Sequence, residues 1–134
     1  MKNHGSTETR NEIKLELEEL SGKIIACAIE VHKTLGPGFL EAIYQAALPL
    51  ELVRAGLNVE EQKEIKIFFH GKEIGTHRLD LVVENQIVVE LKAVKEFSDI
   101  HTAQLLSYLK ATGLKIGLLL NFAKPTIQVK RVVK

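Results

Sequence analysis

The chain has 134 residues, of which 46% are apolar and 26% are charged, and its formal net charge is +1. This length fits one domain with its own hydrophobic core, and so small a net charge does not by itself point to a polyanionic partner. No apolar run approaches the roughly 18 residues of a membrane span, and the N-terminus does not have the pattern of a secretory signal. We therefore expect a cytoplasmic protein. Its single cysteine, Cys27, rules out an internal disulfide and a cluster held by cysteines alone.

The N-terminal part divides into a polar stretch and a long periodic one. Residues 1–12 are polar and are expected to be a flexible segment, which leaves 13–134 as a single domain. Apolar residues then recur at helical spacing up to the sequence LGPG, with Gly22 as a weak point. The residues that carry this period are Ile13, Leu17, Leu20, Ile24, Ala28 and Val31.

A second helix is predicted after the GPGF break. It runs from about Phe39 to Arg54, and Gly56 follows as a natural C-cap. Pro49 lies inside this helix, where it removes a backbone hydrogen bond and crowds the preceding turn. We therefore expect a kink, or an end near Leu48 followed by a restart.

The second half of the chain changes to the alternating pattern of strands. Three strands with two polar turns form a meander, a third helix follows from an N-cap at Asp99 to Gly113, and two short strands complete the chain. The expected strands cover residues 64–69, 76–83, 87–94, 115–122 and 126–133. The order helix, helix, three strands, helix, two strands predicts an α/β domain whose mixed central sheet, with an antiparallel three-stranded meander, is flanked by helices.

Ionisable residues interrupt two strands that are otherwise apolar. A turn at residues 84–86 pairs Val83 with Ile87 and, counted outward, Asp80 with Glu90. Because side chains alternate along a strand, Asp80, Glu90 and Lys92 then share one face, together with Arg78. The apolar neighbours on the other face are Leu79, Leu81, Val89 and Leu91.

Two carboxylates opposed across a ladder destabilise a sheet unless something offsets their repulsion. Mg²⁺ or Mn²⁺ would do so, since both prefer oxygen ligands and need only one or two carboxylates. Lys92 could then orient or deprotonate a water, or stabilise charge on a phosphate. The alternative is an ion-pair network on a solvated face, but both faces of these strands are rich in Val, Leu and Ile.

The arrangement D-x9-E-x-K on a hairpin resembles the PD-(D/E)XK nuclease superfamily. Within it, GFLEAIY at 38–44 is similar to the signature of the GxxExxY family, and further blocks follow in the family's order. The resemblance implies a restriction-endonuclease-like core in which Asp80 and Glu90 are metal ligands and Lys92 is the catalytic lysine. It also implies that Glu41 is a further acidic residue of the site and a metal ligand.

Gln104 and Tyr108 have the Q-x3-Y spacing of RecB-like nucleases, and their i, i+4 positions place both on one helical face. The resemblance therefore adds them to the catalytic residues. His77 and His101 are not spaced as a ligand pair and are left outside the site. Tyr44, at helical spacing, is expected to be a core residue.

The favoured function is a metal-dependent nuclease that hydrolyses phosphodiester bonds in DNA, or alternatively in RNA. A second hypothesis is a catalytically silent adaptor with a nuclease fold, which binds nucleic acid or a protein partner. A third is a purely structural domain without metal affinity. Few aromatic residues are present, which argues against a base-stacking platform. Whether the protein forms a homodimer or works with an accessory protein stays open.

Overall fold

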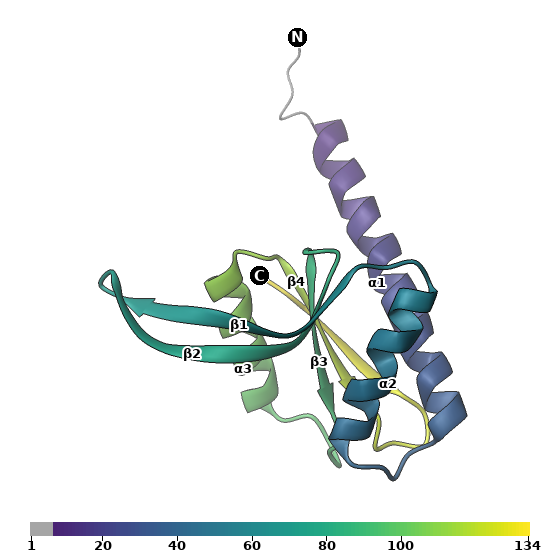
Figure 1. Cartoon of the computed structure of the whole chain (residues 1–134). Coiled ribbons are helices and arrows are strands. Elements are labelled where there is room, and N and C mark those ends of the chain that lie inside the picture. Colours follow the sequence, from purple (N-terminus) through teal and green to yellow (C-terminus); the bar gives the residue numbers. More distant parts are fainter. Residues whose placement is uncertain (1–6) are drawn as a thin grey trace.

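A computed structural model of the chain describes residues 7–134, and its eight elements follow the predicted order (Figure 1). The elements are α1 (Thr7–Leu35), α2 (Glu41–Arg54), β1 (Val59–Phe69), β2 (Lys72–Val83), β3 (Ile87–Lys92), α3 (Asp99–Thr112), β4 (Ile116–Asn121) and β5 (Gln128–Val133). No helix in this part of the chain is long and apolar enough to span a bilayer.

The five strands form one sheet in the order β1-β2-β3-β4-β5. The first three strands are an antiparallel meander, β3 and β4 run parallel, and β5 returns antiparallel to β4. A parallel neighbour requires a crossover connection, and α3 provides it between β3 and β4. The predicted mixed α/β architecture with its antiparallel meander is therefore confirmed.

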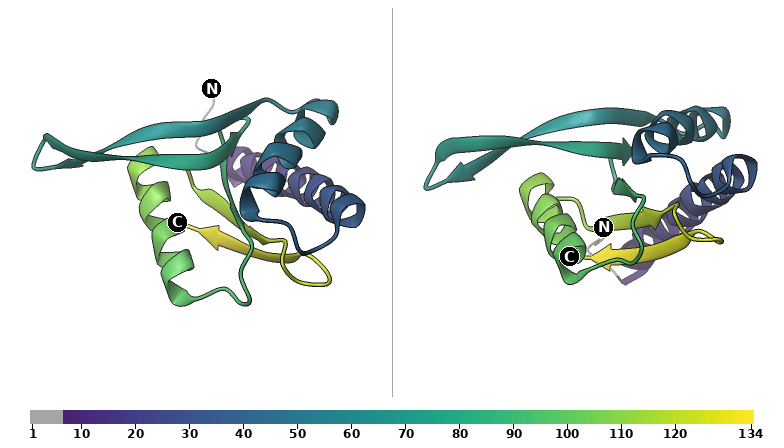
Figure 2. Two further views of the ribbon diagram at one scale, coloured as in Figure 1. Left: turned by 60° about the horizontal axis from the view of Figure 1, so that its bottom comes forward. Right: turned by 90° about the horizontal axis from the view of Figure 1, so that it is seen from below.

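Each face of the sheet is covered by helices (Figure 2). On one face, α1 and α2 bury the larger apolar cluster, which includes Tyr44, Leu81, Leu91 and Phe122. On the other face, α3 packs on a smaller cluster through Leu105 and Leu109. Since both faces are covered, the central strands read as nearly continuous apolar runs, and any charged residue on them is removed from water.

The two N-terminal helices differ from expectation at three points. α1 begins at Thr7, so helix covers residues 7–12 of the stretch predicted to be flexible, while residues 1–6 lie outside the described chain. The helix also passes through Gly22 without interruption. α2 begins at Glu41 rather than near Phe39, and it continues through the buried Pro49 to Arg54, so the predicted end and restart near Leu48 are wrong. Packing of the helix on the sheet outweighs the hydrogen bond that proline removes.

Strands β1 and β2 form a hairpin that is longer than predicted and extends away from the rest of the sheet (Figures 1 and 2). The pairing of the two strands is irregular at Gln62, which has a positive φ of 51° and lies between the pairs Glu61 with Leu81 and Lys63 with Leu79. The register is the same on both sides of this gap, which leaves Gln62 and Asp80 opposite each other without a ladder pair. The register shift of the hairpin lies further out, between Ile67 and Phe68.

The crossover helix α3 begins and ends at defined caps. Its N-cap is Ser98 rather than the predicted Asp99, and the Ser98 N–H donates to Nδ1 of His101 at 3.1 Å. Gly113 closes the helix in the left-handed conformation, with φ of 78°, as predicted. The helix lies close to β4 at Gly117, where a Cβ would come within 2.7 Å of the Leu105 side chain.

Candidate active site

The carboxylates of Asp80 and Glu90 meet where β2 and β3 separate. The ladder between these strands pairs Val83 with Ile87 as predicted, but its last pair is Leu81 with Val89. The predicted ladder pair of Asp80 with Glu90 is therefore wrong, although the two side chains do come together.

Beyond the pair of Leu81 with Val89, hydrogen bonds between side-chain carboxylates and backbone N–H groups take the place of the backbone ladder. The N–H of Asp80 donates to Oε2 of Glu90 at 2.9 Å, and the N–H of Leu91 donates to Oδ2 of Asp80 at 2.9 Å. Each carboxylate thus accepts a hydrogen bond from the backbone of the opposite strand. We name this place, defined by Asp80 and Glu90, the strand fork.

The strand fork also changes which face the neighbouring residues occupy. Leu81 packs in the cluster under α1 and α2, but Leu79 packs with Val82 and Val88 in the cluster under α3. The prediction that Leu79 and Leu81 share a face is wrong, because the irregular pairing at Gln62 interrupts the alternation of β2 next to Asp80.

Burial makes both carboxylates reluctant to ionise. Glu90 is only 5% exposed, and its pKa is raised from 4.5 to about 8, first by burial and then by the negative charge of Asp80. Glu41 raises the pKa of Glu90 further, whereas the Asp80 N–H and the Lys92 charge oppose the shift. The pKa of Asp80 is also raised by burial, against the Leu91 N–H and Lys92. The strand fork therefore lacks positive charge.

Lys92 supplies part of the missing charge. It is the last residue of β3, half-buried, and pairs across the parallel ladder with Asn121. Its ammonium lowers the pKa of both Asp80 and Glu90. The structure therefore brings Asp80, Glu90 and Lys92 within one electrostatic neighbourhood, as the sequence predicts.

The start of α2 brings a third acidic residue, Glu41, to the site through the amide of Gln45. Nε2 of Gln45 donates to Oε2 of Glu41 at 3.3 Å and to Oδ1 of Asp80 at 3.2 Å. Sequence reasoning missed Gln45. The signal was its i+4 spacing from Glu41, which places the two side chains on one face of the helix.

A fully buried tyrosine fixes the start of α2. The hydroxyl of Tyr44 donates to the carbonyl of Gly36 at 2.6 Å and accepts from the N–H of Phe39 at 3.2 Å. Its ring stacks on Phe122 with centroids 4.6 Å apart. Tyr44 is thus the expected core residue, and it ties the preceding loop to the helix that carries Glu41.

From the other face of the sheet, α3 presents Tyr108. The pKa of Tyr108 is raised by burial and then by the negative charges of Glu90 and Asp80. The ring stacks on His77, with centroids 4.1 Å apart. His77, which the sequence reasoning left outside the site, therefore borders it. Gln104 is exposed, and its side chain makes no hydrogen bond or ion pair within residues 7–134.

The donor set suits a hard divalent cation. Among the described residues, no three Asp, Glu, His or Cys side chains converge to hold a metal, so Asp80, Glu90 and Glu41 do not form a closed ligand set. Oε1 of Glu90, however, accepts no hydrogen bond within residues 7–134. Two carboxylates with a free oxygen, in a place that lacks positive charge, fit Mg²⁺ or Mn²⁺, which keep several waters.

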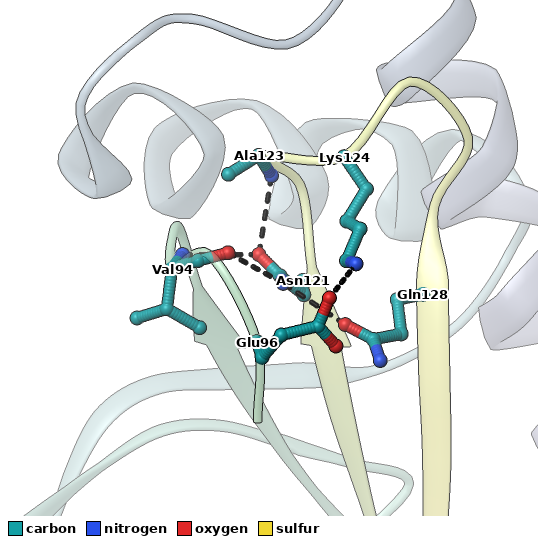
Figure 3. A network of polar contacts seen from close by, with 6 residues as sticks. All are labelled: Val94, Glu96, Asn121, Ala123, Lys124 and Gln128. Atoms are coloured by element: carbon teal, nitrogen blue, oxygen red, sulfur yellow. Dashed lines mark hydrogen bonds and ion pairs between the residues drawn. The ribbon is translucent and has the colours of Figure 1, made fainter. Parts of the chain in front are cut away.

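The neighbouring strand carries a buried polar network of another kind (Figure 3). Asn121 is fully buried, and its amide bonds the N–H and the carbonyl of Val94, the N–H of Ala123 and the side chain of Gln128. Lys124 pairs with Glu96 beside it. This network holds the loop that leaves β3 just after Lys92.

A five-stranded mixed sheet with helices on both faces and an Asp, Glu and Lys set at a strand fork defines a nuclease-type α/β domain. The family model described as the PD-(D/E)XK nuclease superfamily matches residues 18–132. The chain belongs to this superfamily.

Solved structures agree on the fold. The chain is similar to the protein described as "Crystal structure of SSO0001", with a TM-score of 0.56 and 23% sequence identity. The similarity covers 69% of this chain and 49% of that chain, so the matched region spans about half the length of its structural relative. No curated protein matches the chain.

Proposed function

We propose that the protein is a GxxExxY-type nuclease that hydrolyses phosphodiester bonds in a metal-dependent reaction, with DNA as the favoured substrate and RNA as the alternative. The observation that carries the proposal is the strand fork, where the buried carboxylate of Glu90, the half-buried carboxylate of Asp80 and Lys92 come together. A structural domain has no reason to retain an under-compensated pair of like charges in this position.

Asp80 and Glu90 would hold Mg²⁺ or Mn²⁺ through carboxylate oxygens, and Glu41 would contribute directly or through a water. When bound, such an ion supplies a Lewis acid that lowers the pKa of water and offsets the charge on a phosphate. Lys92 would orient the attacking water or neutralise the charge that develops on the phosphate. Gln45 would fix the carboxylates of Asp80 and Glu41 relative to each other.

Tyr108 would orient the substrate or Lys92 from the side of α3. Its position near both carboxylates supports the predicted role. The role of Gln104 would require the exposed amide to meet substrate, because no protein group in residues 7–134 holds it at the carboxylates. The proposed RecB-like pair therefore depends more on Tyr108 than on Gln104.

The test is cleavage of labelled linear single-stranded and double-stranded DNA by the purified protein in Mn²⁺, Mg²⁺ or EDTA. The variants Asp80→Ala and Lys92→Ala should both lose the metal-dependent cleavage while they keep the circular dichroism spectrum of the wild type. Lys23→Ala, which changes an exposed lysine of α1, should cleave like the wild type.

Two results would reject the nuclease proposal. One is the absence of cleavage under every condition together with the absence of Mn²⁺ binding in calorimetry. The other is cleavage that persists in both variants, which would indicate a contaminant. The first result, combined with measurable nucleic-acid binding, would favour the adaptor hypothesis.

A further inference from the structure

A groove lies between the β1 and β2 hairpin and α3, on the face opposite α1. Its volume is about 590 Å³. The residues that line it are Lys66, Ile67 and Phe68 of β1, His77 of β2, and Ser107, Tyr108, Lys110 and Ala111 of α3. Figure 2 shows the hairpin and the helix on either side of it.

The groove leads to the strand fork. Its lining includes both members of the stacked pair His77 and Tyr108. His77 lies on β2 three residues before Asp80, so the groove reaches the strand that carries one of the two carboxylates. A molecule that lies in the groove can therefore extend to the reaction site without crossing the core.

The chemistry of the groove combines cations with an exposed aromatic ring. Lys66 and Lys110 place positive charge on its two sides, one on the hairpin and one on the helix. Lys66 lies 3.7 Å from Glu73, but both side chains are largely exposed, so this pair costs little to exchange for a phosphate. Phe68 is 59% exposed on the groove side of the hairpin.

We propose that this groove holds an unpaired nucleic-acid strand and leads it to the strand fork. The inference rests on the proposed nuclease function and deepens it by naming the form of the substrate. Lysines that track phosphates and an aromatic ring that stacks on bases are the two components of single-strand recognition. In a duplex the base faces are covered by their neighbours, so an exposed ring gains this contact only with unpaired bases. The small number of aromatic residues argues against an extended base-stacking platform. The fold nevertheless places one exposed ring, Phe68, at the groove.

The experiment measures binding separately from cleavage. Fluorescence anisotropy with a labelled mixed-sequence oligonucleotide, single-stranded or annealed to its complement, is carried out in EDTA on the full chain. We expect the single strand to bind more tightly than the duplex. Phe68→Ala should weaken single-strand binding roughly 5- to 100-fold, which corresponds to the loss of one stacked base. Phe68→Trp should retain the wild-type affinity.

Matched controls separate the groove from the hairpin tip and from general charge. Phe69 is adjacent and 63% exposed but does not line the groove, so Phe69→Ala should bind like the wild type. Salt dependence is measured as the slope of log K against the logarithm of the salt concentration. The double variant Lys66→Gln with Lys110→Gln should make this slope less steep by about 0.7 per lysine. The double variant Lys23→Gln with Lys33→Gln on α1 should leave it unchanged.

The inference is overturned if Phe68→Ala binds the single strand as tightly as the wild type, if Phe69→Ala loses as much affinity, or if duplex and single strand bind equally. It is also overturned if the hairpin pairs two copies of the chain, which light scattering would reveal as a dimer dissociated by Phe68→Ala. If groove variants lose binding but the wild type neither cleaves nor binds Mn²⁺, the groove stands and the nuclease proposal fails. If cleavage requires Asp80 but the groove variants bind the single strand like the wild type, the nuclease proposal stands and the groove inference fails.

Discussion

Glu90 and Asn121 are both buried polar residues on neighbouring central strands, yet their surroundings differ in kind. The Asn121 amide uses both its donors and its acceptor in four hydrogen bonds. Glu90 accepts one hydrogen bond, faces the like charge of Asp80 and has a pKa raised to about 8. A neutral and satisfied group stabilises the fold, whereas an ionisable group that is left short of partners lowers stability and retains the capacity to bind an ion.

The largest expected difference is in cleavage. Glu90→Gln keeps an oxygen for the Asp80 N–H but removes the negative charge, so we expect cleavage in Mn²⁺ to fall by about 10²- to 10³-fold. In the same preparation, thermal unfolding without metal at pH 8 should occur at a higher temperature than in the wild type. Unchanged cleavage, or a lower unfolding temperature, would contradict the functional interpretation of Glu90.

Asn121→Ala should lower the stability of the fold, whereas Glu90→Gln raises it. It leaves the N–H groups of Val94 and Ala123 and the carbonyl of Val94 without their protein partner, so the free energy of unfolding should fall by about 1–3 kcal/mol. Urea denaturation measures this. Gln128→Ala removes one hydrogen bond of the same network and should cost about 1 kcal/mol. Equal losses in the two variants would show that the network is not centred on Asn121.

A divalent ion should stabilise the protein, and more so at alkaline pH. At a free concentration about 100 times its Kd, Mn²⁺ adds about 2.7 kcal/mol to the free energy of unfolding. Because the ion must displace the Glu90 proton, the increase in unfolding temperature should be larger at pH 8.5 than at pH 6. Asp80→Asn should reduce the increase in unfolding temperature that Mn²⁺ causes at both pH values. An increase that is the same at both pH values would indicate that Glu90 is not a ligand.

The smallest effect concerns pH alone. Because the Glu90 pKa is about 8 in the folded protein against 4.5 as its ordinary value, the folded state holds a proton that the unfolded chain releases. The contribution of this group to stability is therefore full below about pH 4.5 and is lost as pH rises to about 8. Urea denaturation in EDTA between pH 5 and pH 9 should show this decline in the wild type and a weaker one in Glu90→Gln.

Periodicity and turn residues were sufficient to predict the elements and their order. The pairing of Val83 with Ile87 follows from the short turn, and Gly113 was recognised as a helix end by its residue type. The acidic residues and the lysine of the site were found because charge interrupts apolar strands. These features are local, so the sequence displays them directly.

What the sequence did not predict depends on contacts between distant segments. At the fork Asp80 leaves the ladders on both of its sides, opposite the positive φ of Gln62 on β1, and no residue near Asp80 signals it. Gln45 and His77 join the site only because α2 and α3 pack on opposite faces of the sheet. Continuous helix through Pro49 likewise reflects burial, which outweighs local propensity.

Gly117 gives one position in β4 an influence on the electrostatics of the site. A methyl group there would overlap Leu105, which is fully buried and has little room to move, so α3 would have to shift outward. Tyr108 lies on the same helix, one turn after Leu105, and would move with it, away from Glu90. The absence of a single carbon atom in β4 thus sets how closely the crossover helix approaches the sheet, and with it the position of the helix that carries Tyr108.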